Sequence, residues 1–311
     1  LLLVLSIGLV LGAVALAYKD GVGNTFALDD AHTIVNNPSV RNLASVPRYF
    51  TDPRTFSTLS TNLDYRPVLQ TTYAINHALA RRLTLAEGQA PDGYDTRVWN
   101  LTNIAIHAWV SVCVMLLGRR LFGRGQLAPL PRLSSAQGDL CALAAGLLVA
   151  VHPAFSGAVN YISARSSTLV AALTLPVLLI YLRQLQTRRG GAWVALGCVL
   201  YALALLTKIE AVAMLGVLFV AEILLNPANR AWPILPRMVA ASGFGRVLPY
   251  AVLSVLGVVL WAAMSPLQDS STRAATGVTP LVYLATQTHA WWYYVGQLVA
   301  PVEQMTENLS Y

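Results

Sequence analysis

Long apolar blocks recur along the 311-residue chain and constrain its fold more than any other feature. A helix needs about 20 predominantly apolar residues to cross the hydrocarbon core of a membrane. Hydrophobic residues make up 56% of the chain and charged residues 11%, whereas soluble domains are about a quarter charged. This composition excludes a soluble globular protein, a disordered tail and a disulfide scaffold, so we predict an all-α polytopic membrane protein.

The apolar blocks predict about seven transmembrane helices in one bundle. Several blocks are shorter than a full span, so they must extend into their flanks or lie in locally thinned bilayer. The predicted spans are Leu1–Tyr18, Trp99–Leu117, Gln137–Val151, Tyr161–Leu182, Ala192–Thr207, Ile209–Leu225 and Val247–Met264.

An eighth apolar stretch, Thr279–Ala300, differs from the other seven because it contains Gln287, His289 and the aromatic run Trp291–Tyr294. Clustered Trp and Tyr side chains favour the boundary between lipid and water. We therefore expect a further interfacial helix here, with a spanning helix as the alternative.

Arginines predict the orientation of the bundle. Ten of them lie in the three loops that follow the second, fourth and sixth predicted spans, and short loops rich in positive charge stay in the cytoplasm. The net charge of +7 therefore reports topology, and no nucleic-acid partner is predicted. The ten are Arg119, Arg120, Arg124, Arg132, Arg183, Arg188, Arg189, Arg230, Arg237 and Arg246.

The chain is predicted to form a single membrane module over residues 1–311, with two extracytoplasmic parts. The first loop, residues 18–98, is too long for a simple connection, and it contains amphipathic patterns at Asn42–Phe50 and Pro67–Leu83. The second extracytoplasmic segment covers residues 265–311. The chain begins without Met and directly in an apolar block, so we expect it to belong to a longer protein whose carboxy-terminal part is missing.

Asp29 and Asp30 are the strongest local signal for chemistry. Two adjacent carboxylates just outside the first span can supply a general base or hold a metal ion. Neighbouring side chains of an extended loop point to opposite sides, so only one of the two is expected to face a given pocket. The alternative is a solvated pair that caps the following turn.

Several other polar residues lie in or beside the predicted spans. His107 shares one helical face with Asn100, Asn103 and Ser111, because these residues are three or four positions apart. Polar groups at such depth face the bundle interior or a wet cavity, or they simply join neighbouring helices by hydrogen bonds. His152 ends the third span, and Tyr161 begins the fourth.

Three cations, Arg66, Arg165 and Lys208, are predicted on the same side of the membrane. Together they could surround a phosphate, which a guanidinium binds in bidentate fashion. Lys208 and Glu210 alternatively form an ion pair with each other. The three cysteines lie in apolar blocks without a second ligand nearby, so no metal site is predicted from them; a role for a divalent metal elsewhere stays open.

Five motifs in this order resemble the GT-C superfamily of membrane glycosyltransferases, in particular its protein O-mannosyltransferase-like branch with transmembrane and TPR proteins. The motifs are Phe26-x-x-Asp29-Asp30-x-x-x-Ile34-x-Asn36, Tyr65-Arg66-Pro67, Asn103-x-x-x-His107, His152-Pro153 with Tyr161-Ile-x-Ala-Arg165, and Leu206-Thr-Lys208. Two departures stand out. The branch often has Lys-Glu where this chain has Lys208-Ile-Glu210, and it carries further spans and TPR repeats.

The resemblance implies a GT-C-like bundle that transfers a mannose-like sugar from a polyprenyl- or dolichyl-phosphate donor. Asp29 or Asp30 would activate the acceptor hydroxyl, and basic residues near the membrane would hold the lipid phosphate. The sugar lipid is then the substrate, no cofactor is implied, and the acceptor is a protein or glycan. A prevalence of Arg over Lys suggests a bacterial inner membrane with a periplasmic active side, or the endoplasmic reticulum in a eukaryote.

A second class of function fits the same sequence: a non-catalytic GT-C-like subunit that supports a larger membrane complex. It would keep the bundle and the first loop, but it would not bring an acidic side chain together with cations. A transporter is third, because inverted repeats and broken helices are not seen in the sequence. The placement of Asp29 relative to Arg66, Arg165 and Lys208 separates the first two classes.

Overall fold

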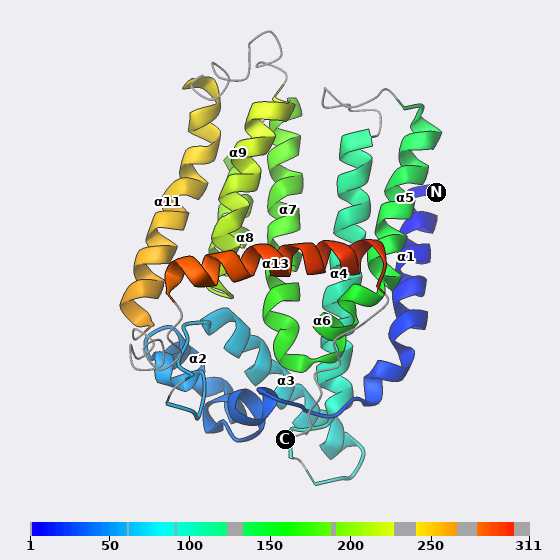
Figure 1. Ribbon diagram of the computed structural model, residues 1–311. Helices are drawn as coiled ribbons and strands as arrows, with labels where there is room; N and C mark the ends of the chain where they lie inside the picture. Colours follow the sequence, from blue (N-terminus) through cyan, green and yellow to red (C-terminus); the bar gives the residue numbers. More distant parts are fainter. Residues whose placement is uncertain are drawn as a thin grey trace.

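The computed structural model describes residues 2–60, 62–90, 92–122, 133–187, 191–226, 241–265 and 279–301. Every regular element among these residues is a helix, which confirms the predicted all-α class (Figure 1). Helices are expected in a lipid environment, because they satisfy every backbone hydrogen bond within one segment.

In the described part of the chain, upright helices form the body of the molecule, and they follow the order of the predicted spans (Figure 1). Consecutive upright helices alternate in direction. They are α1 (Leu2–Tyr18), α4 (Thr96–Phe122), α5 (Ser135–Val151), α7 (Arg165–Thr187), α8 (Gly191–Leu205), α9 (Ala213–Leu225) and α11 (Ala241–Met264).

Fewer than seven of these helices are long and apolar enough to cross a membrane unaided. In the described residues four segments qualify. α5 joins them only if it is counted with the segment Pro153–Asn160, which includes α6 (Ser156–Asn160) and to which α5 is bent by 50°. α8 has 15 residues and is a shorter apolar helix. Length and composition thus leave the predicted count of seven spans unconfirmed. The four segments are Leu2–Gly23, Thr96–Phe122, Ile162–Gln186 and Gly245–Met264.

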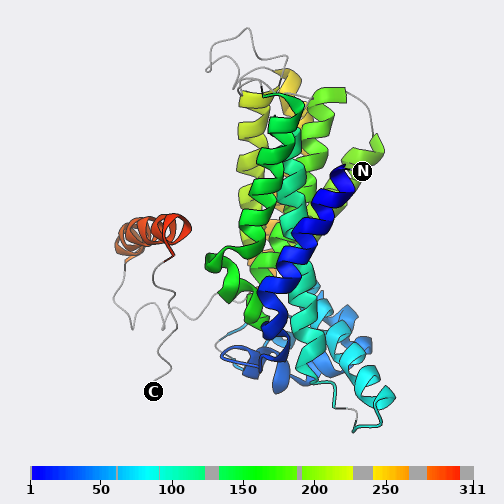
Figure 2. The ribbon, with the colours of Figure 1, turned by 90° about the vertical axis from the view of Figure 1, so that its right-hand side faces the viewer.

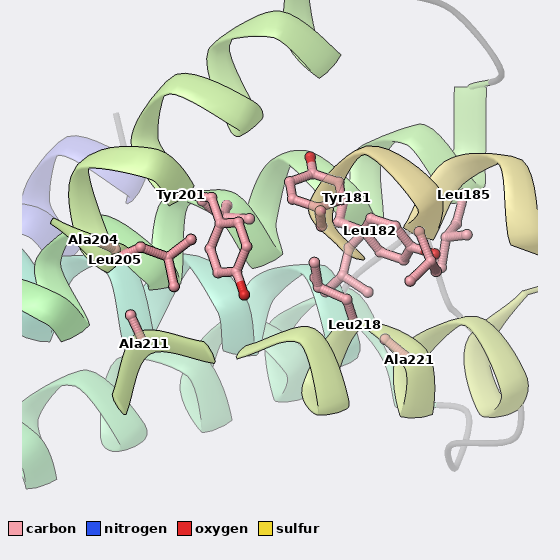
Figure 3. Close-up of a cluster of buried hydrophobic side chains, with 12 residues drawn as sticks. Tyr181, Leu182, Leu185, Tyr201, Ala204, Leu205, Ala211, Leu218 and Ala221 are labelled. Atoms are coloured by element: carbon pink, nitrogen blue, oxygen red, sulfur yellow. The ribbon is translucent and has the colours of Figure 1, made fainter. Parts of the chain in front are cut away.

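Two apolar clusters hold the bundle together. One joins α1, α4 and α5 around Val10, Met115 and Ala142. There, a Cβ added to Gly146 would lie 2.7 Å from the Met115 Cβ, so glycine allows α4 and α5 to approach closely. The other cluster joins α7, α8, α9 and α11, with Tyr181 and Tyr201 among leucines and alanines (Figure 3).

The first loop folds into short helices against the lower end of the bundle (Figure 1). The predicted helix Pro67–Leu83 is present as α3 (Pro67–Ala86). The predicted helix Asn42–Phe50 is instead a 3₁₀ turn, Leu43–Ser45, followed by α2 (Val46–Tyr49). Pro47 suits this start, since proline has no N–H to donate and is tolerated in the first helical turn.

Buried contacts keep the first loop in place. Its apolar cluster includes Ile34 and Tyr73 from the loop, Trp99 from α4 and Ile162 from the segment before α7. The buried amide of Asn37 donates to the backbone oxygens of residues 33, 55 and 56, which closes the loop on itself. The first loop is therefore an ordered, packed layer that covers this end of the bundle.

Helix α13 (Pro280–Val299) runs across the upright helices (Figure 1) and lies apart from the bundle in the second view (Figure 2). The predicted aromatic run is exposed, with Trp292 at 77%. α13 is also not one of the described helices that meet the criteria for a span. α13 crosses the upright helices near the middle of their length rather than at an end of the bundle (Figure 1), so the interfacial position stays a prediction that rests on its aromatic side chains.

Candidate functional site

A cavity of about 250 Å³ lies where the first loop meets the bundle. Its walls come from five separate parts of the chain: the segment around Asp29 and Thr33, the segment from Phe56 to Asn62, the start of α3, the segment leading into α7, and the turn between α8 and α9. The lining residues are Asp29, Thr33, Phe56, Asn62, Arg66, Leu69, Tyr73, Tyr161, Ser163, Ala164, Ser166 and Lys208.

Asp30 is buried and does not line this cavity. Its Oδ1 accepts hydrogen bonds from the backbone N–H (2.9 Å) and the hydroxyl of Ser163, and its Oδ2 accepts from the Ala27 N–H at 3.0 Å. Burial raises the pKa of the Asp30 carboxyl, and these hydrogen bonds and the charge of Arg165 counteract the rise only in part. Asp30 therefore anchors the first loop to the start of α7.

Asp29 faces the cavity, and its side chain is 62% exposed. Leu28 before it has a positive φ of 51°, an uncommon conformation for a non-glycine residue. The Asp29 N–H donates to the Tyr161 hydroxyl at 3.0 Å, and the carboxylate Oδ1 lies 3.3 Å from the His32 Nε2. The two neighbouring aspartates thus take different surroundings, although Asp30 begins the helical turn Ala31–Val35 and the segment is not the extended loop that was expected.

Arg66 and Lys208 bring two basic side chains to the same cavity, and each also forms an ion pair with a neighbouring carboxylate, Asp64 or Glu210. The Arg66 Nε lies 2.6 Å from the Asp64 Oδ2, at an angle outside hydrogen-bond range, so this buried N–H has no hydrogen-bond acceptor among the described residues. The Lys208 ammonium lies 3.3 Å from the Glu210 carboxylate and 3.5 Å from the Ser167 hydroxyl. An ammonium has three N–H donors, so Lys208 can donate a further hydrogen bond to an anion in the cavity.

Arg165 is not a cation of the cavity, which corrects the prediction that it reaches a phosphate there. Its guanidinium is fully buried beneath the lining. Its nitrogens donate to the side-chain oxygens of Asn103 (2.6 Å), Asn76 and Thr72 (3.3 Å), and to the backbone oxygen of Trp99 (3.1 Å). Arg165 thus ties α3, α4 and α7 together, and sequence distance alone could not show that its donors are used internally.

Three further candidates also lie outside the cavity lining. His107 is buried between α1 and α5, with its Nε2 3.4 Å from the Ala150 oxygen. His152 caps the turn after α5, and its Nε2 lies 3.0 Å from the Leu298 oxygen of α13. The side chain of Glu210 is 61% exposed and pairs with Lys208.

The cavity includes polar residues that the sequence analysis did not single out. Ser163 donates hydrogen bonds to Asp30 and also lines the cavity, and Ser166 and Asn62 belong to the same lining. Tyr73 separates the cavity from Arg165, whose guanidinium carbon lies 5.3 Å from the Tyr73 ring centre. Ser163 occupies the unspecified position between Tyr161 and Arg165, which is the one sequence signal that could have indicated it.

The arrangement can bind an anion beside a base. One exposed carboxylate and two cations share a cavity, and the Tyr161 hydroxyl, whose pKa is raised by burial, stays protonated as a hydrogen-bond donor. In the described part of the chain no three His, Cys, Asp or Glu side chains gather so that they could hold a metal ion. The residues present therefore suit acid–base and charge-stabilising chemistry.

The placement of the site is consistent with the predicted topology. The cavity lies at the end of the bundle that carries the first loop (Figure 1), whereas Arg119 pairs with Asp139 of α5 (3.1 Å) at the opposite end. Arg124, Arg132, Arg188, Arg189, Arg230 and Arg237 lie outside the described residues. Which end faces the cytoplasm stays a prediction.

Comparisons with known proteins identify relatives among the O-mannosyl-transferases. No family model and no solved structure matches the chain. Human protein O-mannosyl-transferase TMTC4 is 29% identical over 226 residues, which are 70% of this chain and 29% of that protein. Mouse TMTC4 is 29% identical over 234 residues, again 70% of this chain and 29% of that protein.

A relative from a more distant animal gives the same result. Protein O-mannosyl-transferase F38B6.6 of Caenorhabditis elegans is 27% identical over 169 residues, which are 53% of this chain and 21% of that protein. The chain thus spans less than a third of the length of these curated relatives. The matches agree with the family resemblance carried by the motifs: the chain is similar to the TMTC4 and F38B6.6 protein O-mannosyl-transferases.

Proposed function

We propose that the chain carries the catalytic module of an integral-membrane glycosyltransferase that moves a mannose-like sugar from a polyprenyl- or dolichyl-phosphate donor to a protein hydroxyl. The observation that supports this function most directly is the cavity that combines Asp29 with Arg66 and Lys208. A scaffold has no need of this combination. The names of the relatives support the sugar and the acceptor class.

Asp29 is the proposed general base, in preference to Asp30. A base must come within about 2.6–3.2 Å of the hydroxyl proton that it removes. The Asp29 carboxylate is exposed to the cavity, whereas both oxygens of Asp30 already accept hydrogen bonds from the protein. His32, 3.3 Å from Asp29 and 3.0 Å from the Ser57 hydroxyl, orients the carboxylate.

Arg66 and Lys208 are the proposed partners of the donor phosphate. The leaving group of the reaction is a phosphate, whose developing charge needs stabilisation by fixed cations more than protonation. Arg66 stacks on Phe56, with 5.3 Å from its guanidinium carbon to the ring centre, so its position is restrained. The acceptor hydroxyl would attack from the Asp29 side, and direct displacement would invert the anomeric centre.

The cavity is proposed to open on the extracytoplasmic side, because the arginine-rich loops belong to the other end of the bundle. In a bacterium this side is the periplasm, and in a eukaryote it is the lumen of the endoplasmic reticulum. Phe56 and Leu69 in the lining, together with the adjoining bundle, offer apolar surface to the first isoprene units of the donor.

The base is tested by sugar transfer from a polyprenyl-phosphate mannose donor to a peptide, with the full-length protein. Asp29→Asn keeps the shape of the side chain and removes its basic oxygen, so transfer should fall by roughly 10²–10⁴ with little change in donor binding. Asp20→Asn, a change of an exposed carboxylate outside the cavity, is the control and should leave transfer unchanged. Wild-type transfer by Asp29→Asn would favour the scaffold function.

The phosphate partners are tested by donor binding. Lys208→Ala should weaken binding of the donor by roughly tenfold or more, since a hydrogen bond to a charged group contributes about 1.5–3 kcal/mol. Arg81→Ala removes an exposed arginine from the same α3 region and should have no effect. Equal donor binding by Lys208→Ala and wild type would contradict this assignment of the phosphate site.

A further inference from the structure

A second cleft, of about 370 Å³, lies at the end of the bundle opposite the candidate active site. Three helices form its walls: the first turn of α1, the last two turns of α4 and the last turns of α7. The proposed sugar transfer makes no use of it. The lining residues are Leu3, Leu116, Arg119, Arg120, Leu179 and Gln186.

The cleft is polar at its mouth and apolar at depth. Arg119, Arg120 and Gln186 lie near the helix ends, where a membrane helix reaches the headgroup region. At 1.5 Å per residue, Leu116 lies about 6 Å deeper than Arg120, and Leu179 lies about 10 Å deeper than Gln186. A ligand with a polar head and an apolar chain matches this gradient, whereas a soluble anion uses only the mouth.

The charge at the mouth amounts to one uncompensated cation. Arg119 is already paired with Asp139 at 3.1 Å, so that pair is neutral. Arg120 donates from Nη1 to the uncharged amide oxygen of Gln186 at 3.2 Å, and no carboxylate in the described ranges pairs with it. This contact also holds the Arg120 guanidinium at the cleft between α4 and α7.

We propose that this cleft binds one anionic glycerophospholipid with a single negative charge, such as phosphatidylglycerol. The phosphodiester oxygens accept hydrogen bonds from N–H groups of Arg120 and Arg119, and an acyl chain lies against Leu116 and Leu179. Basic pockets between transmembrane helices are suited to acidic headgroups, and a planar guanidinium binds phosphate oxygens in bidentate fashion. The bound lipid joins α1 to α4 and α7 at this end of the bundle.

The test is native mass spectrometry of the full-length protein in detergent, titrated with phosphatidylglycerol or with phosphatidylcholine. The wild type should bind one phosphatidylglycerol about fivefold more tightly than phosphatidylcholine, the effect of one basic residue near a lipid headgroup. Arg120→Gln should abolish this preference. Arg183→Gln is the matched control, because Arg183 lies on the same helix end but stacks on Trp193, 4.4 Å from its ring centre, outside the cleft.

Two further arms separate a lipid from other occupants. Leu179→Trp fills the deep part of the cleft and should weaken the binding of both lipids. This variant tests the proposal independently if Arg120→Gln does not fold. Glycerophosphoglycerol, the headgroup without chains, should not displace the lipid at equal concentration. A preference retained in Arg120→Gln, equal binding of both lipids by the wild type, or displacement by the free headgroup would each overturn the proposal.

Discussion

Asp30→Asn tests whether a buried carboxylate fixes the first loop to the bundle. The wild-type carboxylate accepts three hydrogen bonds, two of them from Ser163 and one from the Ala27 N–H. An asparagine keeps one oxygen and turns an NH₂ group toward a backbone N–H, so at least one buried donor loses its acceptor. Such a loss costs about 1–3 kcal/mol, and relief from burying a charge offsets part of it.

The effect of Asp30→Asn should depend on pH. Burial raises the pKa of Asp30 above its ordinary value of 3.8, so the folded state favours the protonated carboxyl. Its contribution to stability is therefore fully present below about pH 4 and is lost as pH rises through the folded pKa. The stability gap between wild type and Asp30→Asn should be larger at pH 4 than at pH 7.

The measurement is thermal unfolding of the purified protein in detergent, together with hydrogen exchange of the loop amides. We expect a fall in Tm of about 2–10 °C and faster exchange at the Ala27 and Ser163 N–H groups. Asp29→Asn is the control, because an exposed side chain in a surface ion pair contributes little stability. A wild-type Tm and unchanged exchange in Asp30→Asn at both pH values would refute the anchoring role.

Two further substitutions test the interior of the bundle. Arg165→Met should lower the free energy of unfolding by about 3–5 kcal/mol, because it leaves the buried acceptors of Asn103, Asn76 and the Trp99 carbonyl without donors. The Tm of the variant is compared with that of the wild type. An unchanged Tm would show that the network is dispensable. Gly146→Ala should cost about 1–3 kcal/mol, since its Cβ would overlap the close contact of α4 and α5; chemical unfolding in mixed micelles measures the loss.

The helical elements were predictable because apolar blocks have a direct physical cause. Each of the seven blocks contains a helix, but α4 extends beyond its block at both ends, whereas α7 and α9 begin four residues inside theirs. At Asn42–Phe50 the pattern predicted one helix, but Pro47 and an Asn42 side chain that accepts from the Ala44 N–H gave two short turns. Local capping therefore breaks the predicted helix into two turns, and the hydrophobic periodicity of the sequence does not show such capping.

The candidate site was predictable in its residue types and only partly in its geometry. The sequence brought Asp29, Arg66 and Lys208 to one side of the membrane, and the structure brings them into one cavity. It could not distinguish Asp29 from Asp30, because the difference comes from Ser163, a partner 133 residues away. Nor could it show that Arg165 is buried, since its acceptors lie on two other helices.

The bond between Asp30 and Ser163 also sets an order of events during synthesis. A ribosome adds about 5–20 residues per second, so Ser163 emerges roughly 7–27 s after Asp30. The loop is complete when residue 98 has been added, so for roughly the last 3–13 s of that interval it lacks the partner that fixes it, and Ile34 and Tyr73 lack their contact with Ile162. The newly made loop thus leaves these apolar side chains without their final cover until the segment before the fourth predicted span is added.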